Sequence, residues 1–135
     1  MKLQLVSQNG VSINSDVYEV TLPTSAGRIA VYDLHTPIIT EATTGMVTLR
    51  TTPTSDAEDI TILGGIVEVT AHSLIILADD ISVQTSLEET QIQKAIEDAQ
   101  KMVASAVDRT SLDEAKRQLQ YSSLKLQLVS KKRRK

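Results

Sequence analysis

Apolar and polar side chains alternate along several short segments in the first 85 or so residues. A period of two places one set of side chains on a single face of a β-strand. Leu3 and Leu5 form one such set, and Val47 and Leu49 form another. Six segments show this pattern and are predicted strands: KLQLV, VYEVTL, GMVTLRT, DITIL, IVEVTA and SLIILA.

The connections between these segments read as turns and loops. LPTSAG and TPTSDAED are rich in Pro, Ser, Thr and Asp, which are typical of turns. Many short strands without helices between them favour antiparallel pairing in a sandwich or a barrel. The pair Gly64-Gly65 lies between two predicted strands and indicates a tight turn, a bulge or a close approach of backbones.

The period changes to that of a helix at residue 86. Ser86 and Glu89 have the spacing of a capping box, in which each side chain bonds the other residue's backbone amide. Spacings of three and four then predict one apolar stripe on a helix of about five turns. The stripe consists of Ile92, Ala95, Ile96, Ala99, Met102, Val103 and Ala106.

A second helix is predicted after the interruption VDRT. Ser111 and Glu114 are expected to form its capping box. Two helices joined by a short connection should pack as an antiparallel hairpin. The small residues of the seam bury little area, so its stabilisation should be weak. The second stripe consists of Leu112, Ala115, Leu119, Ser122, Leu126 and Val129.

Composition narrows the possible functions. The chain has 135 residues and no cysteine, which excludes disulfides and thiolate metal sites. No run approaches the roughly 20 apolar residues that span a bilayer, so membrane association is expected only through a partner. The three tyrosines are the only aromatic residues, and stacking platforms for single-stranded nucleic acid are therefore almost absent.

Charge is distributed unevenly. Residues 1–86 carry three basic and ten acidic groups, whereas residues 87–135 carry eleven basic and seven acidic groups. This shift indicates two modules with different partners, although amphipathic helices commonly carry more charge. The pattern and the charge both divide the chain into a β domain over 1–86 and a helical hairpin with a basic tail over 87–135.

Candidate chemistry is sparse. His35 lies beside Asp33 and Thr36, but neighbours on an extended chain point to opposite faces and do not make a triad. His72 is isolated, so the two histidines do not predict a metal site. The pair Glu88-Glu89 suits the positive end of a helix. These observations predict a binding module without an active site.

Two longer segments resemble the epsilon subunit of F-type ATP synthases. GRIAVYDLHTPIITEATTGMVTLR, residues 27–50, is similar to a strand, a "GHAPLLT"-like loop and a second strand of that family. LGGIVEVTAHSLIILADD, residues 63–80, is similar to the family's "GGFxEV…VTILAD" run. The resemblance extends along the whole chain and implies an α+β fold, with an antiparallel β-sandwich followed by a two-helix hairpin.

The resemblance also implies a role and partners. The family member is a non-catalytic rotor subunit that binds the gamma subunit and the ring of membrane-embedded c subunits, beneath the alpha/beta catalytic head. It couples rotation of the ring to the head at the cytoplasmic side of the cell membrane. The implied contact residues for the c ring and gamma are Arg28, Asp33 and His35. The loop departs from the family pattern, because Asp33-Leu34 stands where Pro-Gly is usual.

The helical hairpin is implied to inhibit ATP hydrolysis by extending toward an acidic loop of the head. Positive charge on the second helix and its tail would make this contact, although KKRRK also fits a solvated chain end. The residues concerned are Arg117, Lys125, Lys131, Lys132, Arg133, Arg134 and Lys135.

Regulatory nucleotide binding is expected to be absent. The stretch Thr90–Ala95 matches the family's ATP-binding motif, but Gln91 replaces its acid and Lys94 its arginine. Lysine lacks the planar fork with which arginine grips a phosphate at two points, so no cofactor is predicted. Two alternatives from other classes remain open: a separate nucleotide-sensing module, and nucleic-acid contact through KKRRK.

Overall fold

Ten strands and two helices make up the chain in a computed structural model, which describes all residues except 9, 11, 84–88 and 135. Side chains are not described at 83 and 130–134. The strands are β1 (Lys2–Ser7), β2 (Ser12–Asp16), β3 (Glu19–Thr24), β4 (Gly27–Tyr32), β5 (Ile38–Ala42), β6 (Gly45–Arg50), β7 (Glu58–Ile62), β8 (Gly65–Val69), β9 (Ser73–Ala78) and β10 (Ile81–Val83). The helices are α1 (Glu89–Ser105) and α2 (Arg109–Arg134).

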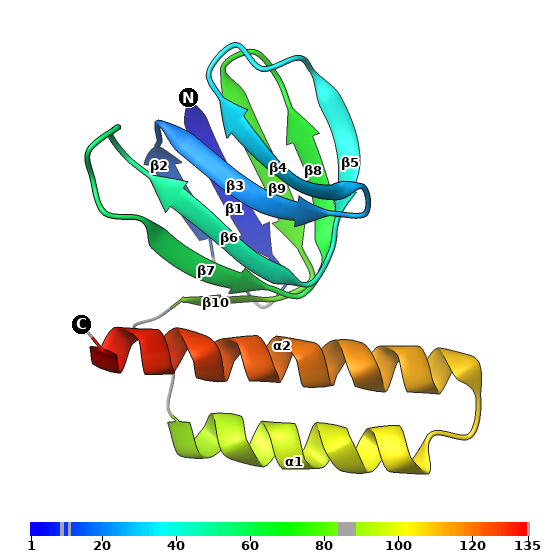
Figure 1. Cartoon of the computed structure of the whole chain (residues 1–135). Coiled ribbons are helices and arrows are strands. Elements are labelled where there is room, and N and C mark those ends of the chain that lie inside the picture. Colours follow the sequence, from blue (N-terminus) through cyan, green and yellow to red (C-terminus); the bar gives the residue numbers. More distant parts are fainter. Residues whose placement is uncertain (9, 11, 84–88, 135) are drawn as a thin grey trace.

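The strands form two layers around one apolar core (Figure 1). One layer has the order β4-β3-β6-β7-β10 and the other β5-β8-β9-β1-β2. A single pair, Thr24 with Ala42, joins β3 to β5 and links the layers. This architecture confirms the predicted fold class. The predicted inward residues Leu3, Leu5 and Val47 are almost fully buried between the layers, as the alternation requires.

Two features of the sheets differ from the sequence prediction. Strand β1 runs parallel to β9, with Lys2 opposite Ser73 and Ser7 opposite Ala78. All other pairs are antiparallel, as predicted. The period-two pattern also missed β2, β4, β5 and β10, because these strands are short or carry few inward apolar residues.

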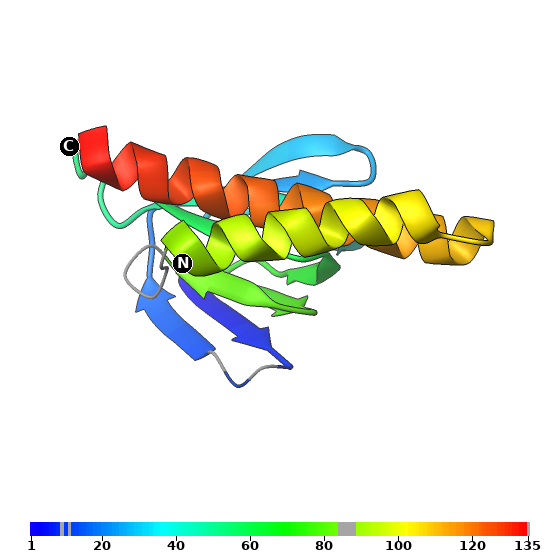
Figure 2. The ribbon, with the colours of Figure 1, turned by 90° about the horizontal axis from the view of Figure 1, so that it is seen from below.

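The two helices form the predicted antiparallel hairpin, and α2 lies between α1 and one end of the sandwich (Figures 1 and 2). Helix α2 therefore has two covered faces. The predicted stripe, including the buried Ala115 and Ser122, lies along one of them, and Tyr121 and Leu128 are also buried. The sequence pattern identified only the first face, so the seam it described as thin is only part of the contact that α2 makes.

The sequence predicts a capping box at the start of each helix. Ser86 lies outside the described residues, so the first box is not described. The second box is wrong, because α2 begins at Arg109 and is capped by Asp108. The Asp108 carboxylate accepts a hydrogen bond from the Ser111 amide at 2.7 Å, and its carbonyl accepts one from the Leu112 amide at 3.1 Å. These are the two bonds expected of an N-cap residue.

Candidate functional site

The loop between β4 and β5, residues 33–37, lies at the end of the sandwich away from the helices (Figure 1); we call it the far-end loop. Backbone and side-chain contacts fasten it to the turn between β8 and β9. The Leu34 amide donates to the Ala71 carbonyl at 2.6 Å, and His72 Nδ1 lies 3.1 Å from Asp33 Oδ1. Both side chains of the Asp33–His72 pair are more than half exposed, so the pair holds the loop while remaining open to solvent.

His35 is held by its own loop. Its ring Nδ1 lies 2.7 Å from the Thr36 carbonyl oxygen, and its amide donates to the Tyr32 carbonyl at 3.3 Å. Across the described part of the chain, no cluster of three His, Asp or Glu side chains is placed to hold a metal ion. The contacts of His35 therefore maintain the shape of the loop.

Arg28, the third predicted contact residue, is not part of the far-end loop. It lies near the opposite end of β4 from Asp33, and five residues of strand separate the two by about 17 Å. Its Nη1 donates to the Met46 carbonyl at 3.0 Å. The structure thus brings Asp33 and His35 together but places Arg28 elsewhere on the sandwich.

An apolar strip crosses the outer face of β5, β8 and β9. It consists of Ile39, Ile66 and Leu77, which are 76%, 56% and 53% exposed. Ile66 lies opposite Leu77 in the strand register and opposite Glu41 on its other side. The three strands contain the exposed acids Glu41 and Glu68 and no basic residue. Ile39 lies opposite Glu68, so exposed apolar and acidic side chains alternate between β5 and β8 on this face.

Sequence reasoning missed the strip. The segments IVEVTA and SLIILA carry apolar residues at positions of both parities. This double pattern was the available signal, because a strand that alternates cleanly has only one apolar face. Alternation alone does not identify which of two apolar faces is covered in the fold.

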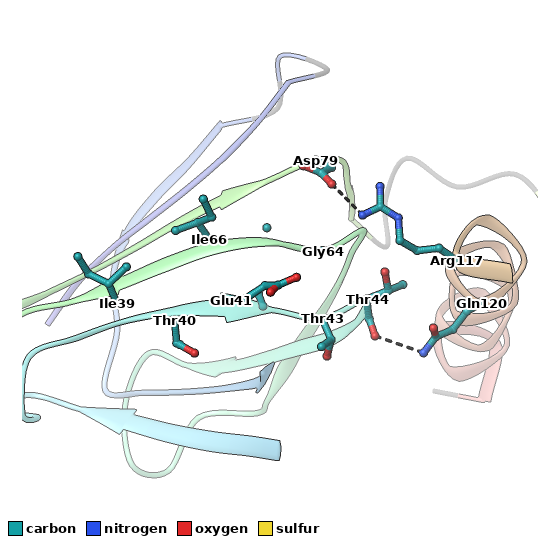
Figure 3. A pocket seen from close by; sticks show the side chains of 12 residues that line it. Ile39, Thr40, Glu41, Thr43, Thr44, Gly64, Ile66, Asp79, Arg117 and Gln120 are labelled. Carbon is teal, nitrogen blue, oxygen red and sulfur yellow. Dashed lines mark hydrogen bonds and ion pairs between the residues drawn. The ribbon is translucent and has the colours of Figure 1, made fainter. Parts of the chain in front are cut away.

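A groove of about 780 Å³ continues from the strip to α2 (Figure 3). Ile39 and Ile66 line one part of it, and Arg117 and Gln120 approach from the helix. The Thr44 hydroxyl has no hydrogen-bond partner among the described residues although Thr44 is buried. The groove therefore joins the sandwich to the helical hairpin along one continuous surface.

Polar contacts fasten α2 to the sandwich. Arg117 Nη1 lies 3.0 Å from Asp79 Oδ2, and Gln120 Nε2 donates to the Thr44 carbonyl at 3.3 Å (Figure 3). The Tyr121 hydroxyl lies 2.8 Å from Ser82 Oγ. Because the last of these contacts is buried, breaking it leaves a polar group without water.

The predicted inhibitory residues lie in different surroundings while the hairpin is packed against the sandwich. Arg117 pairs with Asp79, and Lys125 Nζ lies 4.3 Å from the centre of the Tyr121 ring. Burial raises the pKa of the Tyr121 hydroxyl and lowers the pKa of Lys125. Lys131, Lys132, Arg133 and Arg134 continue α2, and Lys135 lies outside the described residues.

Gln91 and Lys94 occupy the stretch that matches the family's nucleotide motif, and both are exposed on α1. Three positions separate them, so they lie on the same side of the helix. Neither described helix is long and apolar enough to cross a membrane.

Comparison with known proteins identifies the family. The family model described as "ATP synthase, Delta/Epsilon chain, beta-sandwich domain" matches residues 1–84. The chain belongs to the ATP synthase delta/epsilon chain family. The ATP synthase epsilon chain of Xanthomonas campestris is 30% identical over 129 residues, which are 92% of this chain and 91% of the relative. The alignment with epsilon chain 2 of Burkholderia orbicola, also at 30% identity, covers 62% of that protein.

Two solved structures share the epsilon-type fold. A chain of the Euglena gracilis mitochondrial ATP synthase OSCP/F1/c-ring structure matches with a TM-score of 0.71 at 17% identity, over 90% of this chain and 76% of its own. A chain of the Tetrahymena thermophila mitochondrial ATP synthase central stalk and c-ring structure matches with a TM-score of 0.62 at 14% identity. That match covers 98% of this chain and 95% of the other. The likeness includes the helical hairpin as well as the sandwich, because each match covers at least 90% of this chain.

Proposed function

We propose that this chain is a non-catalytic rotor subunit of a proton-translocating ATP synthase, bound to the gamma subunit and the c ring. The observation that carries the proposal is the exposed apolar strip of Ile39, Ile66 and Leu77. Several exposed apolar side chains gathered on one sheet face are characteristic of a docking surface. Family membership supports an ATP synthase as the assembly in which that surface is covered.

The two exposed surfaces of the sandwich suit different partners. We assign the strip to gamma, which is expected to present apolar side chains flanked by basic ones toward Glu41 and Glu68. We assign the far-end loop, with Asp33 and His35, to the c ring. The chain would then sit at the membrane only through the complex, peripherally on its cytoplasmic side.

Substitution within the strip tests the proposal. Ile66→Asp places a charge in the middle of the apolar surface, so co-purification of the full chain with gamma should fall at least tenfold. Val107→Asp is a matched control, because Val107 is 92% exposed in the connection between the helices and lies outside the strip. Equal recovery of gamma with both variants, each folded by circular dichroism, would contradict the assignment.

We further propose that the helical hairpin inhibits ATP hydrolysis when it leaves the sandwich. Arg117 and Lys125 would exchange their intramolecular contacts for contacts with the head, together with the charges of Lys131–Lys135. Exposed ion pairs contribute only about 0–1 kcal/mol each, so several must act together. Their effect should weaken with salt, since the screening length is about 8 Å at physiological ionic strength.

The tail is tested in the assembled enzyme. Replacing Lys131–Lys135 with Gln and Ser should raise the rate of ATP hydrolysis at low salt, and the difference from the wild type should shrink across a salt series. An enzyme whose subunit ends at residue 86 gives the rate without any hairpin. If the tail variant hydrolyses ATP no faster than the wild type at low salt, the tail is not part of the brake.

We propose that the subunit works without a regulatory nucleotide. The exposed Gln91 and Lys94 offer neither a carboxylate nor a guanidinium at the family's motif. A lysine alone provides a mobile point charge and no bidentate grip on phosphate.

A further inference from the structure

Leu34 combines two unfavourable properties in the far-end loop. Its φ is 66°, which makes it the only residue other than glycine with a positive φ in the described part of the chain. Its side chain is 71% exposed. A leucine in this conformation brings Cβ close to the following carbonyl oxygen. Such a backbone conformation persists only where surrounding contacts enforce it, and it is concentrated at functional sites.

Contacts on both sides of Leu34 enforce this positive-φ backbone conformation. Its own amide donates to the Ala71 carbonyl at 2.6 Å. Asp33 pairs with His72 at 3.1 Å, and the His35 amide donates to the Tyr32 carbonyl at 3.3 Å. The loop is therefore ordered before any partner arrives. An apolar side chain carried on a fixed backbone binds with less loss of conformational entropy than one carried on a mobile loop.

On the basis of the rotor function stated above, we propose that Leu34 is the apolar anchor through which the far-end loop binds the c ring. The flanking residues Asp33 and His35 are polar, and a central apolar residue within a polar rim is the usual arrangement of an interface hot spot. The helices cover the opposite end of the sandwich and the strip lies on its side face, so this loop is an exposed surface apart from both, and the proposed function assigns it to the ring. The ring is expected to offer an apolar recess to the leucine.

Four substitutions at Leu34 distinguish the contribution of its side chain to binding from the effect of its backbone strain. Leu34→Ala removes the anchor and keeps the strain. Leu34→Gly and Leu34→Asn remove the anchor and relieve the strain, because glycine and asparagine adopt positive φ readily. Leu34→Met keeps both an apolar side chain and the strain. For each full-length variant, two affinities are measured: one for the detergent-purified c ring carrying gamma, and one for isolated gamma. The thermal midpoint of each variant is measured as well.

The anchor predicts opposite effects on binding and stability. The Ala, Gly and Asn variants should bind the ring–gamma complex about 10- to 30-fold more weakly, and the Met variant within about threefold of the wild type. The Gly and Asn variants should also melt about 1–4 °C higher, since released strain outweighs the added freedom of the unfolded chain. Binding to isolated gamma should not change.

Different failures have different meanings. Ala, Gly and Asn variants that bind the complex as tightly as the wild type would overturn the anchor while leaving the rotor function standing. An equal loss of affinity for isolated gamma would overturn the assignment to the ring. A wild-type chain that binds neither gamma nor the complex would contradict the rotor function itself.

Discussion

Tyr121 connects the helical hairpin to the sandwich through a buried hydrogen bond. Only 2% of it is exposed, and its hydroxyl bonds Ser82 on β10. An aromatic ring contributes a large buried area, and its hydroxyl contributes direction. Burial raises the pKa of that hydroxyl, so it stays protonated throughout the physiological range and keeps this bond.

Tyr121→Phe is expected to lower the free energy of unfolding by about 1–2 kcal/mol, because the buried Ser82 hydroxyl loses its partner. Urea titration measures this loss. Adding Ser82→Ala should recover part of it, since the serine hydroxyl is then no longer left unsatisfied, whereas the Asp80 carboxylate still loses its interaction with the tyrosine hydroxyl. Tyr18→Phe, at a tyrosine that is 44% exposed, is the control and should change stability little. A double variant no more stable than Tyr121→Phe alone would show that the bond is not the cause.

At the scale of the element, the start of α2 is set by Asp108 rather than by Ser111. Hydrogen bonding from the Ser111 amide, with a further contribution from its side chain, lowers the pKa of Asp108 below its ordinary value of 3.8. A carboxyl with a lowered pKa in the folded state stabilises that state above its ordinary pKa. The contribution is lost as the pH falls through the lowered value.

Asp108→Ala should therefore lower both the helical circular dichroism signal and the thermal midpoint at pH 7. The difference from the wild type should diminish as the pH falls below 3.8. Asp108→Asn keeps a neutral cap and should lose less. Ser111→Ala, which keeps the amide, is the matched control with a smaller effect. If Ser111→Ala proved more damaging than Asp108→Ala, Ser111 would be the dominant cap after all.

At the scale of the whole molecule, the sandwich has a core of its own. The buried apolar cluster runs from Leu3 to Ile81 and, among the side chains that the structure describes, includes none from either helix. Helix α2 is attached to the outside of this core and α1 is attached to α2 (Figure 1). Removing the hairpin therefore takes away a covering layer and leaves the apolar cluster complete.

A chain ending at residue 86 is expected to fold cooperatively and to join gamma and the c ring. Its thermal midpoint should fall by a few degrees, because the sandwich surface beneath α2 becomes exposed. Calorimetry measures the midpoint, and co-purification measures assembly. A broad transition without cooperativity would show that the hairpin is needed for the sandwich to fold. A folded chain that failed to assemble would assign binding to the hairpin.

Local spacing in the sequence was sufficient for the elements that bury one clear face. Leu3 and Leu5 alternate within β1, and Ile92 and Ala99 recur with the helical period within α1, and all four are buried. The physical reason is that strand and helix periods are properties of neighbouring residues. The resemblance of residues 27–50 and 63–80 added the family, which the comparisons confirm.

Only the tertiary structure decided the features that depend on distant parts of the chain. These include the parallel pairing of β1 with β9, the Asp33–His72 and Ser82–Tyr121 contacts, and the exposure of Ile39 and Ile66 on one sheet face. Each of these features joins segments that are far apart in the sequence, and no local period encodes that separation. In a strand with apolar residues on both faces, the sequence does not distinguish the buried face from the exposed one. Burial of one face and exposure of the other arise only when the layers pack, and in this protein that packing leaves the strip and the far-end loop exposed.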